Sequence, residues 1–191
     1  MIRPLPLLTT VGLILATAAY LLWLGRSPIC DCGYVLLWHG EVMSDENSQH
    51  LTDWYTPSHV LHGILFFGAL WVVARRLSFG WRLAIATLVE STWEIVENSD
   101  AVIDRYRTAT AALDYYGDSV LNTVSDLLAM VLGFWLASRL PVWASVAIVI
   151  GAEVVTITLI RDGLALNILQ LLWPSDAISA WQTELWGASP Q

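Results

Sequence analysis

The sequence predicts an all-α protein, a polytopic bundle of about five membrane-spanning helices with one further short helix near the C-terminus. Two observations support this class. Hydrophobic residues make up 56% of the 191 residues and charged residues only 14%, whereas soluble domains carry about 25% charged residues. Apolar windows long enough to cross a bilayer recur along the chain. The net charge of -8 argues against a nucleic-acid partner, which would require a basic surface.

Polar segments and helix breakers separate the predicted spans. The first span follows Arg3 and is predicted to be an uncleaved anchor, because no small-residue cleavage pattern follows it. The second begins at Thr56, the predicted cap, and Pro57, which suits the first turn of a helix. The fifth ends before Asp162-Gly163. The predicted spans cover residues 5–24, 57–74, 81–97, 118–138 and 142–160.

The polar segments complete one integral membrane domain, predicted to comprise residues 1–191. Residues 25–56 form a predicted extracytoplasmic loop, and residues 99–117 a predicted extracytoplasmic connector. Residues 164–173 are apolar but too short to span a bilayer, so we expect an interfacial helix there. The residues after Pro174 are expected to be loosely held.

The sequence contains no lysine, so arginine supplies every permanent positive side-chain charge and its distribution predicts the orientation. The shortest loops carry the densest arginine and should face the cytoplasm. This predicts a cytoplasmic N-terminus and a periplasmic C-terminus in the inner membrane of a bacterium. The arginines assigned to the cytoplasmic side are Arg3, Arg75, Arg76, Arg82 and Arg139.

The two cysteines, Cys30 and Cys32, are separated by one residue. A disulfide between them would close a small, strained ring. We therefore predict a pair of thiols or an occasional metal ligand, with two thiols of no particular role as the alternative.

Three stripes of polar side chains lie inside the predicted spans, all at the same end of their helices. Members of each stripe are three or four residues apart and so share one helix face. A carboxylate in hydrocarbon costs several kcal/mol unless it has a partner or water. The stripes are therefore predicted to meet in one polar site in the outer leaflet. They comprise His59 and His62; Glu90, Glu94 and Glu97; and Asp118, Asn122 and Asp126.

So many acids cannot all stay charged in a medium of low dielectric constant. A bound divalent ion would resolve the conflict, and a mixture of imidazole and carboxylate suits Zn²⁺, Mn²⁺ or Fe²⁺. Shared protons, or arginines such as Arg105 and Arg107, are the alternatives. The predicted metal ligands are His59, His62, Glu90, Glu94 and Asp126. Glu94 is the predicted general base, with His59 and Asp126 beside it.

A purely structural interpretation competes with this one. Membrane helices use Asn and Asp to hydrogen-bond their neighbours, which would account for Asn122. Glu97 and Asp118 would then be wet helix ends, and Asp118 would also suit a helix cap. Glu153, alone in the fifth span, would join the network or pair with Arg161.

Several runs of the sequence carry a resemblance to a known family. They are Glu46-Asn47-Ser48-Gln49-His50, Asp53-Trp54-Tyr55-Thr56-Pro57-Ser58-His59, Trp93-Glu94-Ile95-Val96-Glu97-Asn98-Ser99 and Asp114-Tyr115-Tyr116-Gly117-Asp118-Ser119. Over nearly the whole chain the sequence resembles a family of small proteobacterial inner-membrane proteins known only as a domain of unknown function. The resemblance implies a multi-pass cell-membrane location and no activity. The order of histidine, glutamate and Asp-x-x-x-Asn, leading to Gly133, also resembles VanZ-like membrane domains, which implies a link to the cell envelope.

Three hypotheses for function follow. The first is a metal- or carboxylate-dependent hydrolase or transferase acting on a lipid-linked or envelope substrate at the membrane surface. The second is a proton- or ion-coupled transporter component, since buried acids serve as proton relays. The third is an accessory or assembly protein without chemistry of its own, with the acidic loops and the Cys-Asp-Cys segment holding an envelope protein or a metal.

Overall fold

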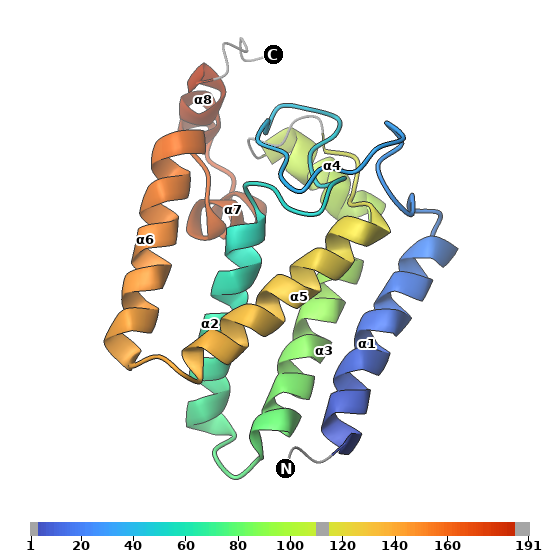
Figure 1. Ribbon diagram of the computed structural model, residues 1–191. Helices are drawn as coiled ribbons and strands as arrows, with labels where there is room; N and C mark the ends of the chain where they lie inside the picture. The colour runs from blue at the N-terminus through green and yellow to red at the C-terminus, as the bar shows by residue number, and fades with distance from the viewer. Residues whose placement is uncertain (1–3, 110–114, 186–191) are drawn as a thin grey trace.

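A computed structural model describes residues 4–109 and 115–185 of the chain. These residues form eight helices and no strand, which confirms the predicted all-α class (Figure 1). The helices are α1 (Pro4–Trp23), α2 (Thr56–Val73), α3 (Phe79–Glu97), α4 (Asp100–Ala109), α5 (Val120–Ala137), α6 (Val142–Ile160), α7 (Leu164–Leu172) and α8 (Asp176–Leu185).

Four helices of the described chain are long and apolar enough to cross a membrane: α1, α2, α5 and α6. Helix α3 has 19 residues and lies between α1 and α2 in the bundle (Figure 1). It carries Arg82 and three glutamates, so its composition alone does not identify it as a span. The helical bundle is as predicted, whereas the predicted span 81–97, which corresponds to α3, and the orientation in a membrane stay predictions.

Two glycines allow α2 and α5 to cross in close contact. A Cβ atom added to Gly63 would overlap the carbonyl oxygen of Met130, and one added to Gly133 would overlap that of Val60. Small residues at a crossing let two helix backbones approach closely. This crossing brings the first turns of α2 against α5, and the polar stripes of both helices lie there.

The N-terminal end of α2 is capped differently from the prediction. Asp53, not Thr56, supplies the cap: its Oδ1 accepts hydrogen bonds from the backbone N–H groups of Tyr55 (2.7 Å) and Thr56 (3.3 Å). Thr56 Oγ1 instead accepts from the N–H of Asp53 at 3.1 Å. Asp53 rather than Thr56 accepts these hydrogen bonds because its carboxylate lies on the loop side of the unpaired N–H groups of the first turn.

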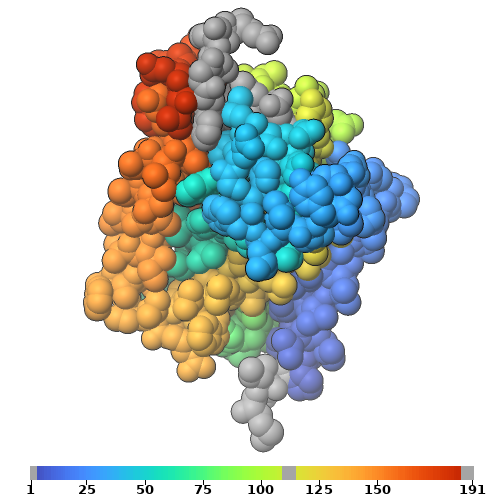
Figure 2. All heavy atoms as spheres, turned by 45° about the horizontal axis from the view of Figure 1, so that its top comes forward, coloured from blue at the N-terminus to red at the C-terminus, as the bar shows by residue number. Residues whose placement is uncertain are grey.

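The predicted loop is ordered and packs over one end of the bundle, where its atoms cover much of the upper face in Figure 2. Two backbone N–H groups at the start of α5 hold the loop. The N–H of Ser119 donates to the carbonyl of Ser48 (3.0 Å), and the N–H of Val120 donates to the carbonyl of Ser27 (2.9 Å). The loop side chains Asn47, His50 and Asp53 are buried. This loop therefore forms the lid over the polar end of the helices.

Cys30 and Cys32 form a disulfide, so the prediction of two free thiols was wrong. A turn closed by the Gly33 N–H and the Cys30 carbonyl (3.1 Å) brings the two Cα atoms to 5.1 Å. That separation lies in the usual range for disulfides. The spacing alone was a poor guide because it ignored the turn.

The C-terminal part is more structured than expected. Residues 164–173 contain the predicted short helix, α7, but Asp176–Leu185 form α8 rather than part of a loose tail. The rest of the predicted tail, residues 186–191, lies outside the described residues. Arg161 holds α8 through the carbonyl of Trp181 and through Glu184, whose Oε2 lies 3.0 Å away. Arg161 therefore does not pair with Glu153. Glu153 caps α7 instead, accepting from the N–H of Leu164 (2.9 Å) and of Ala165 (3.1 Å).

Candidate functional site

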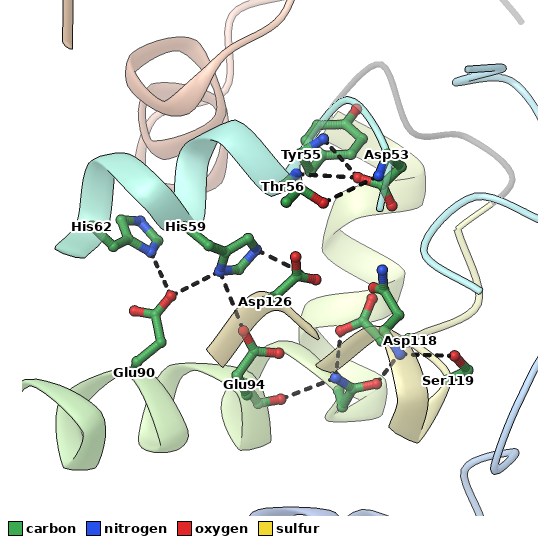
Figure 3. A network of polar contacts seen from close by, with 12 residues as sticks. Asp53, Tyr55, Thr56, His59, His62, Glu90, Glu94, Asp118, Ser119 and Asp126 are labelled. Atoms are coloured by element: carbon green, nitrogen blue, oxygen red, sulfur yellow. Dashed lines mark hydrogen bonds and ion pairs between the residues drawn. The ribbon is translucent and has the colours of Figure 1, made fainter. Parts of the chain in front are cut away.

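The polar stripes occupy the same end of three helices: the first turns of α2 and α5 and the last turns of α3 (Figure 1). In Figure 3 the side chains from these helices point toward one another. The structure brings five of the predicted residues into one cluster, which we call the His–Glu cluster: His59, His62, Glu90, Glu94 and Asp126.

One carboxylate oxygen joins the two imidazoles of the His–Glu cluster. Glu90 Oε1 lies 2.7 Å from Nδ1 of His59 and 2.8 Å from Nδ1 of His62. An ionised carboxylate only accepts hydrogen bonds, so each Nδ1 acts as the donor. Glu94 Oε1 lies 3.3 Å from Nδ1 of His59, and Asp126 Oδ2 lies 3.8 Å from its Nε2. His59 is thus surrounded by three acids.

Four carboxylate oxygens of the cluster have no hydrogen-bond partner among the described residues. They are Oε2 of Glu90, both side-chain oxygens of Glu94 and Oδ1 of Asp126. Glu90 and Glu94 are fully buried, and Asp126 is 4% exposed. Buried polar atoms are almost always hydrogen-bonded, and an unpaired one costs about 1–3 kcal/mol. The cluster is therefore poorly explained as a device that only holds helices together.

The cluster opens onto a cavity of about 360 Å³. His59, His62, Glu90 and Asp126 line it, whereas Glu94 lies behind His59 and does not. Part of the wall is apolar and reaches the surface of the bundle, because Leu65, Val89 and Ile168 are each nearly half exposed. The cavity thus joins a polar end to an apolar opening on the side of the bundle.

The other three predicted residues belong elsewhere. Glu97 and Asp118 line the far end of the cavity. Asn122 does not reach the cluster; its Nδ2 donates to the carbonyl of His50 at 2.9 Å and ties α5 to the loop. Asp118 is not a cap, because Ser119 accepts the N–H of Asn122 at 3.1 Å and takes that role for α5.

Sequence reasoning missed Asn98, which organises a second network. Its Nδ2 donates to Asp118 Oδ2 (2.7 Å) and to the carbonyl of Glu94 (3.0 Å), and its Oδ1 accepts the N–H of Asp118 (2.8 Å). Tyr115 adds a hydrogen bond to Asp118 Oδ1 at 2.9 Å. We call these three residues the Asn98 network. Its signal was visible, since Asn98 continues the spacing of four from Glu90 and Glu94.

Burial governs the pKa of two acids that lie outside the helices that could span a membrane. Burial raises the pKa of Asp53, against the effect of the two N–H groups that it caps. Burial also raises the pKa of Asp162 to about 6. Tyr55 donates to Asp162 Oδ2 at 3.1 Å, and burial together with this acid raises the tyrosine pKa well above its usual value.

The arginines proposed to neutralise the acids point away from them, so that prediction was wrong. Arg105 donates to the carbonyl of Leu171 through Nε and Nη2, both at 3.2 Å. The guanidinium of Arg107 lies 4.6 Å from the ring centre of Tyr116. The two side chains satisfy backbone and aromatic partners nearer to them, and protons or a bound cation are left to balance the cluster.

Three groups of side chains in the described chain place possible metal donors within 4.8 Å of one another. His59, His62 and Glu90 form one group, and Glu94, Glu97 and Asp118 form the second. The third combines Glu46 and His50 with the two cysteines, which offer no thiolate while joined as a disulfide. The first has the mixed donor set that transition ions prefer.

Comparisons with known proteins confirm the resemblance to a family of unknown function. Residues 21–184 match the family model described as a protein of unknown function, DUF2585. A UPF0314 protein of Paracoccus denitrificans is 70% identical over 96% of this chain and 95% of its own length. UPF0314 proteins of Rhizobium meliloti (57% identical; 83% of this chain, 81% of theirs) and Novosphingobium aromaticivorans (51%; 92% and 91%) are similar as well. No solved structure matches. The likeness to VanZ-like domains stays a prediction.

Proposed function

The chain belongs to the DUF2585 family of unknown function, and we propose that it is a membrane-embedded, metal-dependent hydrolase or transferase acting on a lipid-linked substrate. One observation supports the proposal above the others. Buried carboxylate oxygens without partners lie beside two imidazoles, in a cavity whose apolar wall opens on the side of the bundle. Such an arrangement suits a cation at the polar end and a lipid chain at the other.

The donor atoms of the His–Glu cluster fit a divalent ion such as Zn²⁺, Mn²⁺ or Fe²⁺. His59, His62 and Glu90 would hold the ion, with Glu94 completing the set through the oxygen 3.3 Å from His59 Nδ1. Binding would release the imidazole protons that now face Glu90. A bound ion of this kind supplies Lewis-acid activation of a water molecule or a substrate hydroxyl.

Asp126, rather than Glu94, is then the better general base. Asp126 lines the cavity and has an unpartnered Oδ1, whereas Glu94 lies behind His59. A general base must come within hydrogen-bond reach of the proton that it accepts. Its other oxygen, 3.8 Å from His59 Nε2, would orient that imidazole. Within this proposal Glu94 keeps its predicted role as a metal ligand, and Asp126 replaces it as the general base.

A transporter is less well supported by the packing. Below the cluster, Ala86, Met130 and Phe134 are buried and pack with Phe67 and Phe79. An ion path needs polar groups or water along its length, and this apolar layer interrupts the polar one. An accessory role, with an envelope protein bound to the loop, leaves the unpaired oxygens without explanation.

The proposal includes a location. We place the protein in the bacterial inner membrane with its N-terminus in the cytoplasm, its C-terminus in the periplasm and its site in the outer leaflet. The start of α1 and helix α8 lie at opposite ends of the bundle (Figure 1), which is compatible with termini on opposite sides of a bilayer.

Elemental analysis of protein purified in an uncharged detergent tests the metal. We expect about one transition ion per chain in the natural protein and less than a tenth of that in the double variant His59→Ala, Glu94→Ala. Glu184→Gln, which changes an exposed acid on α8, is the control and should keep the ion. Folded protein that contains no metal, and binds none on titration with Zn²⁺, Mn²⁺ or Fe²⁺, would contradict the proposal.

A further inference from the structure

The far end of the cavity, beyond the His–Glu cluster, combines aromatic rings with acids. Tyr55, Tyr106, Tyr115 and Trp93 line it, together with Glu97 and Asp118. The rings of Tyr106 and Tyr115 meet edge to face, with centroids 5.2 Å apart. Aromatic faces beside carboxylates are the surroundings in which proteins bind ammonium groups, through cation–π attraction and charge.

The same end is unsuited to an anion. No arginine is among the described residues that line the cavity, and the sequence contains no lysine. The tyrosine hydroxyls already donate to internal acceptors: Tyr55 to Asp162 (3.1 Å), Tyr106 to Asn167 (3.0 Å) and Tyr115 to Asp118 (2.9 Å). A phosphate placed there would meet acids and few free donors, and burying an unpaired charge is strongly unfavourable.

Two buried groups facing the cavity lack partners in the described chain. Asp126 Oδ1 is an acceptor without a donor, and Asn47 Nδ2 is a donor without an acceptor. Asp126 is 4% exposed and Asn47 is 3% exposed. A ligand with a positive nitrogen and a nearby oxygen, such as a hydroxyl or ester oxygen, would satisfy both.

We propose that the cavity binds an amphiphile whose headgroup carries an ammonium nitrogen, held by the tyrosines, Glu97 and Asp118. Its hydrocarbon chain leaves along Leu65, Val89 and Ile168 on the side of the bundle. The inference rests on the proposed function, since it names the substrate class of the same site. It places the headgroup beside the His–Glu cluster, within reach of Asp126.

Binding of matched amphiphiles tests the charge selectivity. Decylammonium, whose nitrogen can donate to Asp126 Oδ1, and decyl phosphate are titrated into protein in dodecyl maltoside, and calorimetry gives the dissociation constants. We expect one ammonium amphiphile per chain, bound at least tenfold more tightly than the phosphate. Glu97→Gln should weaken the ammonium probe about tenfold, while Glu184→Gln, the surface control on α8, should not. Leu65→Trp, in the half-exposed apolar wall, should also weaken binding of the ammonium probe, although it changes no acidic side chain.

Equal or tighter binding of decyl phosphate would overturn the inference, as would unchanged ammonium binding in both Glu97→Gln and Leu65→Trp. Each titration is repeated on protein treated with a chelator and on protein loaded with Zn²⁺. Selective ammonium binding by protein that takes up no metal would contradict the metal-dependent function and leave this inference standing. Metal uptake at the His–Glu cluster without ammonium selectivity would do the reverse.

Discussion

Two buried polar networks lie side by side at one end of the bundle (Figure 3), and they differ in how completely their atoms are paired. In the Asn98 network, both oxygens and the backbone N–H of Asp118 have hydrogen-bond partners. In the His–Glu cluster, Glu94 has no side-chain hydrogen bond at all within the described residues. Burial is similar in both, so solvent does not explain the difference.

The completeness of hydrogen bonding distinguishes structural residues from functional ones more sharply than residue type does. A fully paired buried network stabilises and orients the fold, whereas a partly paired one is destabilising on its own. Proteins retain such groups where a ligand completes them. We therefore assign the hydrogen bonds of the Asn98 network to architecture, where they fix Asp118 and Tyr115 in the cavity wall, and the unpartnered oxygens of the His–Glu cluster to binding. The following variants test that division.

The largest loss of stability is expected from Asn98→Ala. The change removes three hydrogen bonds and leaves the buried Asp118 with the Tyr115 hydroxyl, which should lower the free energy of unfolding by about 4 kcal/mol. Guanidinium unfolding in maltoside micelles, followed by circular dichroism, measures it. Thr92→Ala, which removes an exposed hydroxyl from the same helix, should change little. A loss below about 1 kcal/mol would break the assignment of this network to architecture.

Gly133→Ala tests whether the geometry of the His–Glu cluster comes from helix packing rather than from its own contacts. The added Cβ would overlap the Val60 carbonyl and force α2 and α5 apart, at a cost of about 3 kcal/mol. Bound metal should fall as well, because His59 and Asp126 face each other across that crossing. The control is Gly68→Ala on α2, where a Cβ meets nothing within 4 Å. Equal stability of the two variants would refute the close crossing.

Glu94→Gln should have the opposite sign from Asn98→Ala. In metal-free protein, Glu94 is a buried carboxylate without a hydrogen bond to any described residue, and its Oε1 has only the 3.3 Å contact with His59 Nδ1. Replacing it by an amide should raise the free energy of unfolding by about 1–2 kcal/mol. The same variant should lose most of its metal in elemental analysis. Glu184→Gln again serves as the exposed control. A destabilised Glu94→Gln protein would show that this acid supports the fold, and the contrast between the two networks would fail.

The sequence predicts much of this arrangement because helix geometry is local. Spacings of three and four placed His59 with His62, and Glu90 with Glu94, on single faces. Because successive spans run in opposite directions, those faces then come together at one end of the bundle. The apolar lengths predicted α1, α2, α5 and α6 in the same way.

The sequence could not predict which hydrogen-bond partner each polar side chain has in the folded protein. Asn122 and Asp126 share a face, yet Asn122 binds the loop and Asp126 faces His59. Glu153 was expected to face the network or Arg161 but caps α7. These choices depend on where loops and short helices pack, and spacing carries no information about segments distant in sequence. The close crossing at Gly63 and Gly133 was invisible for the same reason.

The smallest expected effect concerns Asp162, a buried carboxylate that is paired with Tyr55, a residue of the cavity wall. It accepts from Tyr55 (3.1 Å) and from the N–H of Gly163 (2.8 Å), with Glu153 nearby. Burial raises its pKa from 3.8 to about 6, so the folded state holds the proton more tightly than the unfolded one. The contribution of this group to stability is therefore most favourable below pH 4 and falls as pH rises through 6.

From pH 5 to pH 7 the stability of Asp162→Asn relative to the natural protein should rise by about 1 kcal/mol. Parallel guanidinium unfolding curves at the two pH values measure it, with Asp176→Asn, at the start of α8, as the control. A difference that stays constant between pH 5 and pH 7 would mean that hydrogen bonds offset the burial of a carboxylate completely, and the incomplete pairing of the His–Glu cluster would then matter even more.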